Sequence, residues 1–143
     1  MSLFDSVNRP TKGIAVDVGC KGNPGPIEYR GIDLATGEEV FYFSFSGDST
    51  NNIGEYLAAV HGLVYCADKG LDVYSDSKTA ISWIRKKFVK TSFTLEDPIQ
   101  IRAMERAALF LKTNNTQVKF WSNVEWGETP ADLSGRKGVA KRK

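Results

Sequence analysis

The sequence has few residues of the types that form covalent cross-links or zinc sites. Its 143 residues include two cysteines, Cys20 and Cys66, and one histidine, His61. The cysteines form no CxxC pair, so neither a zinc motif nor a disulfide framework is indicated, and we expect two reduced thiols. No apolar run approaches the length of a membrane span, and the first residues lack the basic-then-apolar pattern of a secretion signal. We therefore expect a cytoplasmic protein with no membrane partner.

An excess of charge of one sign is also missing. The formal net charge of +2 does not by itself predict a nucleic-acid partner, so local clusters must decide that question. A composition of 41% hydrophobic and 25% charged residues is typical of one globular domain with one core. We expect this domain at residues 13–138, after a weakly ordered leader at 1–12 and before a basic tail at 139–143, and we expect a monomer.

Hydrophobic periodicity predicts a mixed α/β domain. Strand patterns occupy residues 13–19, 28–34, 39–46, 71–77 and 116–122, and helical patterns occupy 52–69, 77–87, the segment after Pro98, and 130–136. The resulting order, β-β-β-α-β-α-α-β-α, combines a three-strand meander with alternating helices and strands. This order predicts a five-stranded mixed sheet flanked by helices.

Asp17 stands inside the first of these strands, in "GIAVDVG". A buried carboxylate without a partner is costly because its charged form loses hydration. Asp17 therefore needs either a cationic partner or a cleft in which a cation binds.

Three other acidic residues stand where the predicted strands and helices meet. Glu55 lies in the first turn of the first predicted helix, Asp76 ends the fourth strand, and Asp132 lies near the start of the last helix. Structural roles are also open: Glu55 and Asp132 could complement a helix dipole, and Asp76 could cap a helix. Strand ends and the following helix starts meet in one crevice of such sheets. If the first and fourth strands are neighbours, Asp17 and Asp76 lie side by side.

Carboxylates gathered in this way repel one another unless a cation compensates. An oxygen-only ligand set, without cysteine or histidine, suits Mg²⁺ or Mn²⁺ better than zinc. Two such ions roughly 3.5–4 Å apart form a clamp for in-line phosphoryl displacement. Taken singly, the residues at helix starts favour structural roles; taken together with their flanking motifs, the four acidic residues favour phosphodiester chemistry with two divalent ions.

Four segments, taken together, resemble the type 1 ribonuclease H family. They are "DVGCKGNPGP", "TNNIGEYLAAVHGL", "VYSDSKTAISWI" and "PADLSGR", and they follow the order of the family's motifs. The resemblance runs from Gly13 to about Arg136. It implies a ribonuclease H-like fold and an endonuclease that cuts the RNA strand of RNA–DNA hybrids with two Mg²⁺ ions, or Mn²⁺, leaving 5′-phosphate and 3′-hydroxyl ends.

The resemblance also implies roles for individual residues. Asp17 would be shared by both ions, Glu55 and Asp76 would hold one ion, and Asp132 would complete the other. Thr50 would approach a phosphate of the DNA strand. The full set of implied contacts to the hybrid is Gly19, Cys20, Asn23, Thr50, Asn51, Asn52, Trp83, Lys86 and Lys87.

Three of these residues have structural alternatives. Trp83 would pack against the DNA backbone, but a tryptophan on a helix also suits core packing. Lys86 and Lys87 belong to a cationic run at the end of a helix, which also suits the helix dipole and a solvated face. A position after Trp83 favours nucleic-acid contact for the lysines.

The sequence departs from the family at two places. Many members carry a histidine in the loop before the last aspartate, but here that loop is "SNVEWGETPAD" and has none. Asn123, Glu125 or Glu128 could take its role, or water could. His61 is expected to pack or lie at the surface, because it is well off the Glu55 face of its helix. The family's basic handle after the second helix is shortened or absent.

Two other functions remain open at this stage. The chain could be a catalytically inactive module that binds hybrids, or another nuclease of the superfamily, such as a transposase or a Holliday-junction resolvase. The presence of all four carboxylates argues against the inactive module. The "GNPG" and "TNN" segments suit contacts with 2′-hydroxyl groups and favour the hybrid nuclease.

Overall fold

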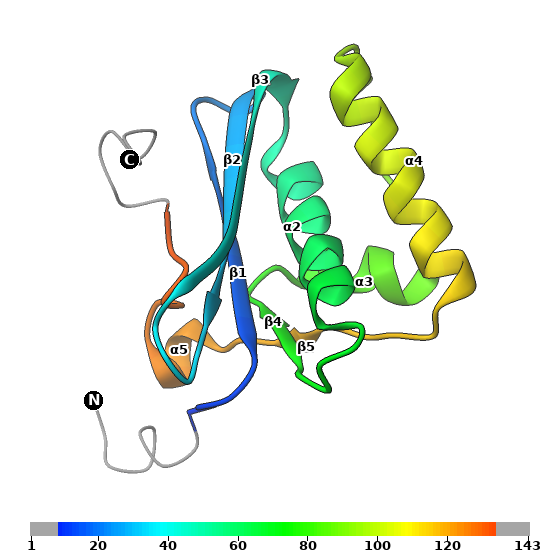
Figure 1. Cartoon of the computed structure of the whole chain (residues 1–143). Coiled ribbons are helices and arrows are strands. Elements are labelled where there is room, and N and C mark those ends of the chain that lie inside the picture. Colours follow the sequence, from blue (N-terminus) through cyan, green and yellow to red (C-terminus); the bar gives the residue numbers. More distant parts are fainter. Residues whose placement is uncertain (1–8, 134–143) are drawn as a thin grey trace.

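The structure is a computed structural model that describes residues 9–133 (Figure 1). The strands are β1 (Ile14–Cys20), β2 (Gly25–Asp33), β3 (Glu39–Ser49), β4 (Val73–Ser75) and β5 (Lys119–Phe120). The helices are α2 (Asn51–Cys66), α3 (Lys78–Lys86), α4 (Pro98–Thr113) and α5 (Asn123–Trp126). This order confirms the predicted succession as far as the fifth strand, β-β-β-α-β-α-α-β.

The strands form one mixed sheet in the order β3-β2-β1-β4-β5. Neighbours β1 and β2, and β2 and β3, pair antiparallel, whereas β4 lies parallel to both β1 and β5. The first and fourth strands are therefore neighbours, as the pairing of Asp17 with Asp76 requires. The predicted five-stranded mixed sheet is confirmed.

Helices α2, α3 and α4 lie on one side of the sheet, and the chain after β5 passes to the other side (Figure 1). On the helical side, Val16 and Val18 of β1 belong to the main core together with Leu57 of α2. On the opposite side, Ala15 and Ile32 form a smaller buried cluster with Ala131. The central strand β1 is thus covered on both sides, which explains its almost continuous apolar sequence.

Helix α2 approaches the sheet closely because two of its residues are glycines. A Cβ at Gly54 would lie 2.5 Å from Val18 Cγ2, and one at Gly62 would lie 2.9 Å from Val73 Cγ1. Real side-chain carbons do not come that close, so no other residue fits at either position without moving the helix. Since Gly54 precedes Glu55, this contact also sets how near Glu55 lies to β1.

The ends of α2 are close to those expected from the sequence. The helix begins at Asn51, where the Thr50 side chain caps it by accepting a hydrogen bond of 3.2 Å from the Ile53 amide. It ends at Cys66, three residues before the expected Lys69, and the chain turns until Gly70 at φ +66°. The capping sequence therefore marks this helix start well.

The last helix is placed differently from the expectation. We predicted a loop from Ser122 and a helix over residues 130–136, but α5 occupies part of the loop, residues 130–131 form a turn and residues 132–133 are irregular. Ser122 caps α5 by accepting a hydrogen bond of 3.2 Å from the Glu125 amide. Residues 134–136 lie outside the described residues, as do 1–8 of the predicted leader and the whole predicted tail. None of the helices within 9–133 is both long and apolar enough to cross a bilayer.

Candidate metal centre and nucleic-acid interface

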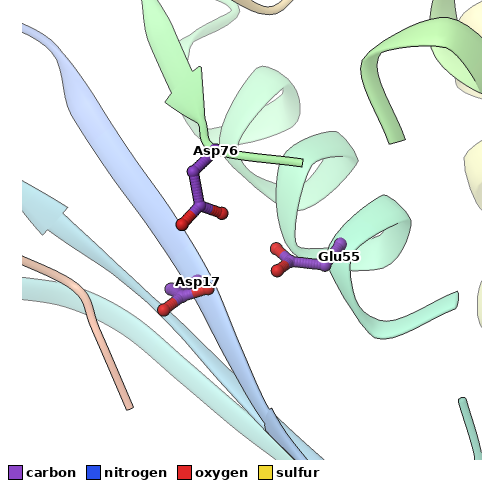
Figure 2. Close-up of side chains that lie close together, drawn as sticks. All are labelled: Asp17, Glu55 and Asp76. Carbon is purple, nitrogen blue, oxygen red and sulfur yellow. The ribbon is translucent and has the colours of Figure 1, made fainter. Parts of the chain in front are cut away.

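Three carboxylates from three different elements converge at one point (Figure 2). Asp17 comes from β1, Glu55 from α2, and Asp76 from the residue after the end of β4. Each offers an oxygen, and these oxygens all lie within 4.8 Å of one another. The structure thus brings together three of the four acidic residues that the sequence predicts to meet.

The parallel pairing of β1 and β4 places two of these residues side by side. Their last paired residues are Ala15 and Tyr74. Asp17 and Asp76 each follow two residues later, so they continue the same register past the end of β4. Carboxyl ends of neighbouring parallel strands meet at one edge of a sheet, and this edge is where polar sites form in α/β proteins.

The structural alternatives for Glu55 and Asp76 are wrong. Glu55 is the fifth residue of α2, beyond the first turn, and is only 7% exposed, so it does not serve as a solvated complement to the dipole. Ser77 caps α3, accepting a hydrogen bond of 3.0 Å from the Ala80 amide, so Asp76 is not the capping residue. Neither carboxylate is needed to form the helix beside it.

Burial makes the ionised forms of two of these groups costly. Asp17 is 5% exposed, and burial, followed by the charge of Asp76, raises its pKa to about 7. Burial and then the charge of Asp17 raise the pKa of Glu55 well above its usual value. The Glu55 Oε1 atom is also buried without a hydrogen-bond partner. Among the described residues, Glu55 Oε1 is thus the unsatisfied oxygen of the cluster, whereas Asp17 shares a hydrogen bond with Glu55 and Asp76 accepts one from Asn123.

Asp17 has a cationic neighbour that does not neutralise it. Arg30 of β2 lies directly opposite Asp17 in the antiparallel ladder. Its guanidinium instead donates to backbone carbonyls near the end of the described chain and pairs with Glu39 at 3.6 Å. Of the two readings of the buried Asp17, the cleft that awaits a cation fits better than the paired ion.

Asp132, the fourth predicted member, lies outside the cluster of three. It is half-buried, and its amide donates a hydrogen bond of 2.9 Å to the Thr129 carbonyl. Its charge nevertheless contributes to raising the pKa of Asp17, after burial and the charge of Asp76. Asp132 thus acts electrostatically on the site from the segment that covers the other side of the sheet.

The two loops predicted to contact RNA are joined directly. The Asn23 Oδ1 atom accepts a hydrogen bond of 2.9 Å from the Asn51 amide, which connects the "GNPG" turn to the first residue of α2. Asn51 and Asn52 are both exposed. One continuous polar rim therefore runs from the turn after β1 to the start of α2, beside the carboxylates.

Other predicted contact residues in this region have structural tasks of their own. The Thr50 hydroxyl caps α2. The Cys20 thiol donates to the Gly22 carbonyl within its own turn. Gly19 is buried, and a Cβ there would lie 3.2 Å from Leu133 Cβ, so Gly19 makes room for the chain that crosses it. Their contacts with a hybrid stay predictions.

The residues predicted on α3 divide into two groups. Trp83 is 6% exposed and meets Tyr56 edge to face, so core packing accounts for it and we do not retain it as a contact to DNA. Lys86 and Lys87 are exposed at the end of the helix, where Lys87 adopts a left-handed conformation with φ 56°. Only the lysines are placed to reach a ligand.

Among the three candidates for the role of the loop histidine, one touches the site. Asn123, the first residue of α5, donates a hydrogen bond of 2.9 Å from Nδ2 to Asp76 Oδ2. Glu125 and Glu128 are exposed on the same loop. The sequence interpretation kept all three open, and the structure singles out Asn123 by this contact.

His61 packs as expected from its position on α2. Its ring stacks on Phe41 with centroids 4.0 Å apart, and its Nδ1 atom shares a hydrogen bond of 2.8 Å with the Tyr29 hydroxyl. Burial lowers its pKa. These contacts confirm a packing role on the helical side of the sheet.

Sequence reasoning missed Arg30. The signal was present, because "GPIEYRGID" carries a cation inside a strand just as "GIAVDVG" carries an anion. The same argument from the cost of a buried charge applies to both segments.

Fold and site together define an α/β protein with a buried cluster of carboxylates at the edge of a mixed sheet. Comparison with protein-family profiles found no match. By sequence, the chain is 35% identical over 91 residues, or 63% of its length, to a ribonuclease H of Desulforamulus reducens. It spans 57% of that relative. The resemblance to ribonuclease H predicted from the four segments is confirmed by this match.

Solved structures also align with much of the chain. The ribonuclease H domain of a Mycobacterium tuberculosis protein, 20% identical, aligns with 79% of this chain and 84% of that domain at a TM-score of 0.48. A ribonuclease H1 of Halobacterium salinarum, 22% identical, aligns with 78% of this chain and 86% of its own at a TM-score of 0.47.

Proposed function

We propose that this chain is a ribonuclease H that cuts the RNA strand of RNA–DNA hybrids endonucleolytically, leaving 5′-phosphate and 3′-hydroxyl ends. The observation that carries the proposal is the cluster of Asp17, Glu55 and Asp76, whose oxygens lie within 4.8 Å of one another. Such an arrangement is self-repelling in the protein alone, since two of its members are buried. The sequence similarity to a ribonuclease H supports the same conclusion.

The residues present fit a divalent metal centre. All donors are oxygens, and the Glu55 Oε1 atom is buried without a hydrogen-bond partner, as a ligand atom would be. We infer that Asp17 is shared by two ions, that Glu55 and Asp76 hold one, and that Asp132 completes the other. When bound, two Mg²⁺ or Mn²⁺ ions supply the charge that activates a water and stabilises the leaving 3′ oxygen.

The protein's own residues bind and orient the hybrid around this centre. The rim made by Asn23, Asn51 and Asn52 offers amide groups to the minor groove and the 2′-hydroxyls, where RNA differs from DNA. Gly19 and Cys20 border this rim, and Thr50 lies at its α2 end. Lys86 and Lys87 extend the interface along the backbone by charge alone.

The loop that carries α5 holds the side of the centre formed by Asp76. The hydrogen bond from Asn123 fixes the orientation of the Asp76 carboxylate, and Asn123 can yield it when product leaves. Glu125 and Glu128 lie on the same exposed loop and serve as alternatives for this step. We propose Asn123 as the residue that stands in for the missing loop histidine.

Cleavage of a strand-labelled RNA–DNA hybrid tests the proposal. We expect cutting of the RNA strand with Mg²⁺ or Mn²⁺, none with EDTA, and a loss of more than about a thousandfold in Asp76→Asn, since a metal ligand contributes several kcal/mol to catalysis. Single-stranded RNA and duplex DNA serve as control substrates. Cutting of duplex DNA would point to another nuclease of the superfamily, and hybrid binding without cutting would point to an inactive module.

A further inference from the structure

Strand β2 carries one positively charged residue, which is paired with Asp17 of β1. This residue, Arg30, has a side chain that is 12% exposed. Burying a charge to this extent is costly unless the charge is paired and its hydrogen bonds are satisfied. The partners of Arg30 therefore show what the residue is for.

The partners of Arg30 are three consecutive backbone carbonyls. Its Nε atom donates to the Ala131 carbonyl at 3.1 Å, and its Nη2 atom donates to the carbonyls of Pro130 and Asp132, both at 3.4 Å. Its Nη1 atom faces Glu39 at 3.6 Å, which holds the guanidinium from the side of β3. A planar guanidinium has donors pointing in several fixed directions, so one Arg can grip successive carbonyls where a Lys cannot.

Residues 129–133, here called the C-terminal strap, lie across the side of the sheet away from the helices. Two hydrogen bonds shape the strap internally, from the Ala131 amide to Thr129 Oγ1 at 3.0 Å and from the Asp132 amide to the Thr129 carbonyl at 2.9 Å. Ala131 and Leu133 are fully buried against the sheet on either side of Asp132. The strap is thus seated by two small apolar contacts and by the grip of Arg30.

We propose that Arg30 is a positioning residue that holds the C-terminal strap so that Asp132 faces Asp17 across the sheet edge. This inference rests on the proposed function, because it gives Asp132 a place in the centre formed by Asp17, Glu55 and Asp76. Arg30 does not touch substrate or metal; it acts through the backbone of the residue that does. Arg30 and Asp17 are paired in the ladder between β1 and β2. The register of these two strands therefore fixes the position of Asp17 and also the position of the residue that holds Asp132.

The test compares Arg30→Met, Arg30→Lys and the control Lys119→Met in the full chain. Lys119 is a cation on β5 with an ion pair to Asp72 at 3.0 Å and no contact with the strap among its described bonds. The first measurement is amide hydrogen exchange of the metal-free protein. We expect exchange at Ala131 and Asp132 to rise at least about tenfold in Arg30→Met, because charge-assisted hydrogen bonds are removed, with β1 amides unchanged.

The second measurement is hybrid cleavage as a function of Mg²⁺ and of substrate. Partners that orient a metal ligand are worth about 10- to 100-fold in activity or metal affinity. We expect kcat of Arg30→Met to fall by about that factor and the half-saturating Mg²⁺ concentration to rise, with KM for the hybrid within about twofold of wild type. Arg30→Lys keeps the charge beside Glu39 and should lose less, and Lys119→Met should match wild type.

The outcomes separate the two proposals. Wild-type protein that does not cut the hybrid overturns the proposed function and the positioning role together. An active wild type with unchanged strap exchange in both Arg30 variants overturns the grip alone. Faster strap exchange with normal kcat and Mg²⁺ dependence shows a merely structural contact and also overturns the positioning role. If Arg30→Met does not fold, the same criteria apply to Arg30→Lys.

Discussion

Asp17 and Arg30 are buried charges that face each other on neighbouring strands, yet the protein treats them differently. Arg30 is satisfied from within, by three carbonyls of the C-terminal strap and by Glu39. Asp17 is surrounded by further carboxylates, and its pKa is raised to about 7 by burial and then by Asp76. Arg30 thus has its partners within the protein, whereas burial and neighbouring carboxylates keep the charged form of Asp17 costly, as expected at a site for a cation.

The surroundings of the two charges differ in kind. The guanidinium of Arg30 donates to the backbone carbonyls of residues 130–132 and pairs with Glu39. Oxygens of Asp17, Glu55 and Asp76 lie within 4.8 Å of one another, a set that could hold a metal ion. We therefore expect Arg30 to stabilise the fold and Asp17 to cost stability in the metal-free protein.

The largest effect we expect is an opposite change of stability in two variants of metal-free protein at pH 8. Asp17→Asn should raise the free energy of unfolding by about 2–4 kcal/mol, because it removes a buried charge whose pKa lies about three units above its unfolded value. Arg30→Met should lower it by about 1.5–3 kcal/mol, because charge-assisted hydrogen bonds are removed. Urea denaturation measures both.

The pH dependence gives this prediction its sign. The pKa of Asp17 is about 7 in the folded protein against an ordinary value of 3.8. Between these values the folded protein holds a proton that the unfolded chain has released, so the free energy of unfolding of wild type should fall as pH rises from about 4 to 7. Asp17→Asn should flatten this fall, and added Mg²⁺ should stabilise wild type only. If the free energy of unfolding changed with pH equally in wild type and Asp17→Asn, the charge of Asp17 would not be costly in the folded protein, and its contrast with Arg30 would be wrong.

A second variant moves the acidic cluster without changing any charge. Gly54→Ala places a Cβ where Val18 Cγ2 would be only 2.5 Å away, so α2 must shift away from β1 and carry Glu55 with it. We expect a loss of about 1–3 kcal/mol from overpacking, together with weaker Mg²⁺ binding in titration calorimetry. Val64→Ala, at a half-exposed position of the same helix, is the control. Unchanged Mg²⁺ binding in Gly54→Ala would show that the helix spacing does not set the site.

A smaller effect is expected on the loop that holds Asp76. Asn123→Ala removes one hydrogen bond to the carboxylate, worth about 1 kcal/mol, and should lower kcat roughly three- to tenfold. Glu125→Ala and Glu128→Ala are measured beside it, and Glu125→Ala should change kcat least, since the bond that Glu125 makes to Ser122 comes from its amide, which alanine keeps. Full turnover in all three would leave the role of the missing histidine to water.

Much of the site could be predicted because the cost of a buried charge is visible in sequence. Asp17 stood out in an apolar strand, and the sequence stated the condition under which it lies beside Asp76, namely that the first and fourth strands are neighbours, which the strand order meets. The start of α2, expected at residue 52, lies at Asn51. In each case a local rule and the overall fold point to the same answer.

Other features depend on contacts between distant residues. Arg30 holds the backbone of residues 130–132 from about a hundred positions earlier, so a short local pattern that suits a helix start does not decide the structure there. Trp83 is typical of either a surface or a core position until the packing against Tyr56 is known. Asn123 could not be preferred to Glu125 or Glu128, because its partner Asp76 is set by the tertiary fold.

The smallest effect we expect concerns two lysines that belong neither to the acidic cluster around Asp17 nor to the contacts of Arg30. Lys86 and Lys87 are exposed at the end of α3, without the enclosing partners that Arg30 has, and so are available to the hybrid backbone. Replacing both by alanine should leave the fold and kcat near wild type and reduce the slope of log binding constant against log salt by about 2, one for each phosphate that a lysine no longer neutralises. Fluorescence anisotropy with a labelled hybrid, in Ca²⁺ to limit cutting, measures the slope from low to moderate salt. Lys112→Ala, at the C-terminal end of α4, is the control for the loss of one positive charge elsewhere on the helical side, and its slope should stay that of wild type. An unchanged slope in the double variant would assign these lysines to the helix dipole and solvent, and would confine recognition of the hybrid to the rim around Asn23 and Asn51.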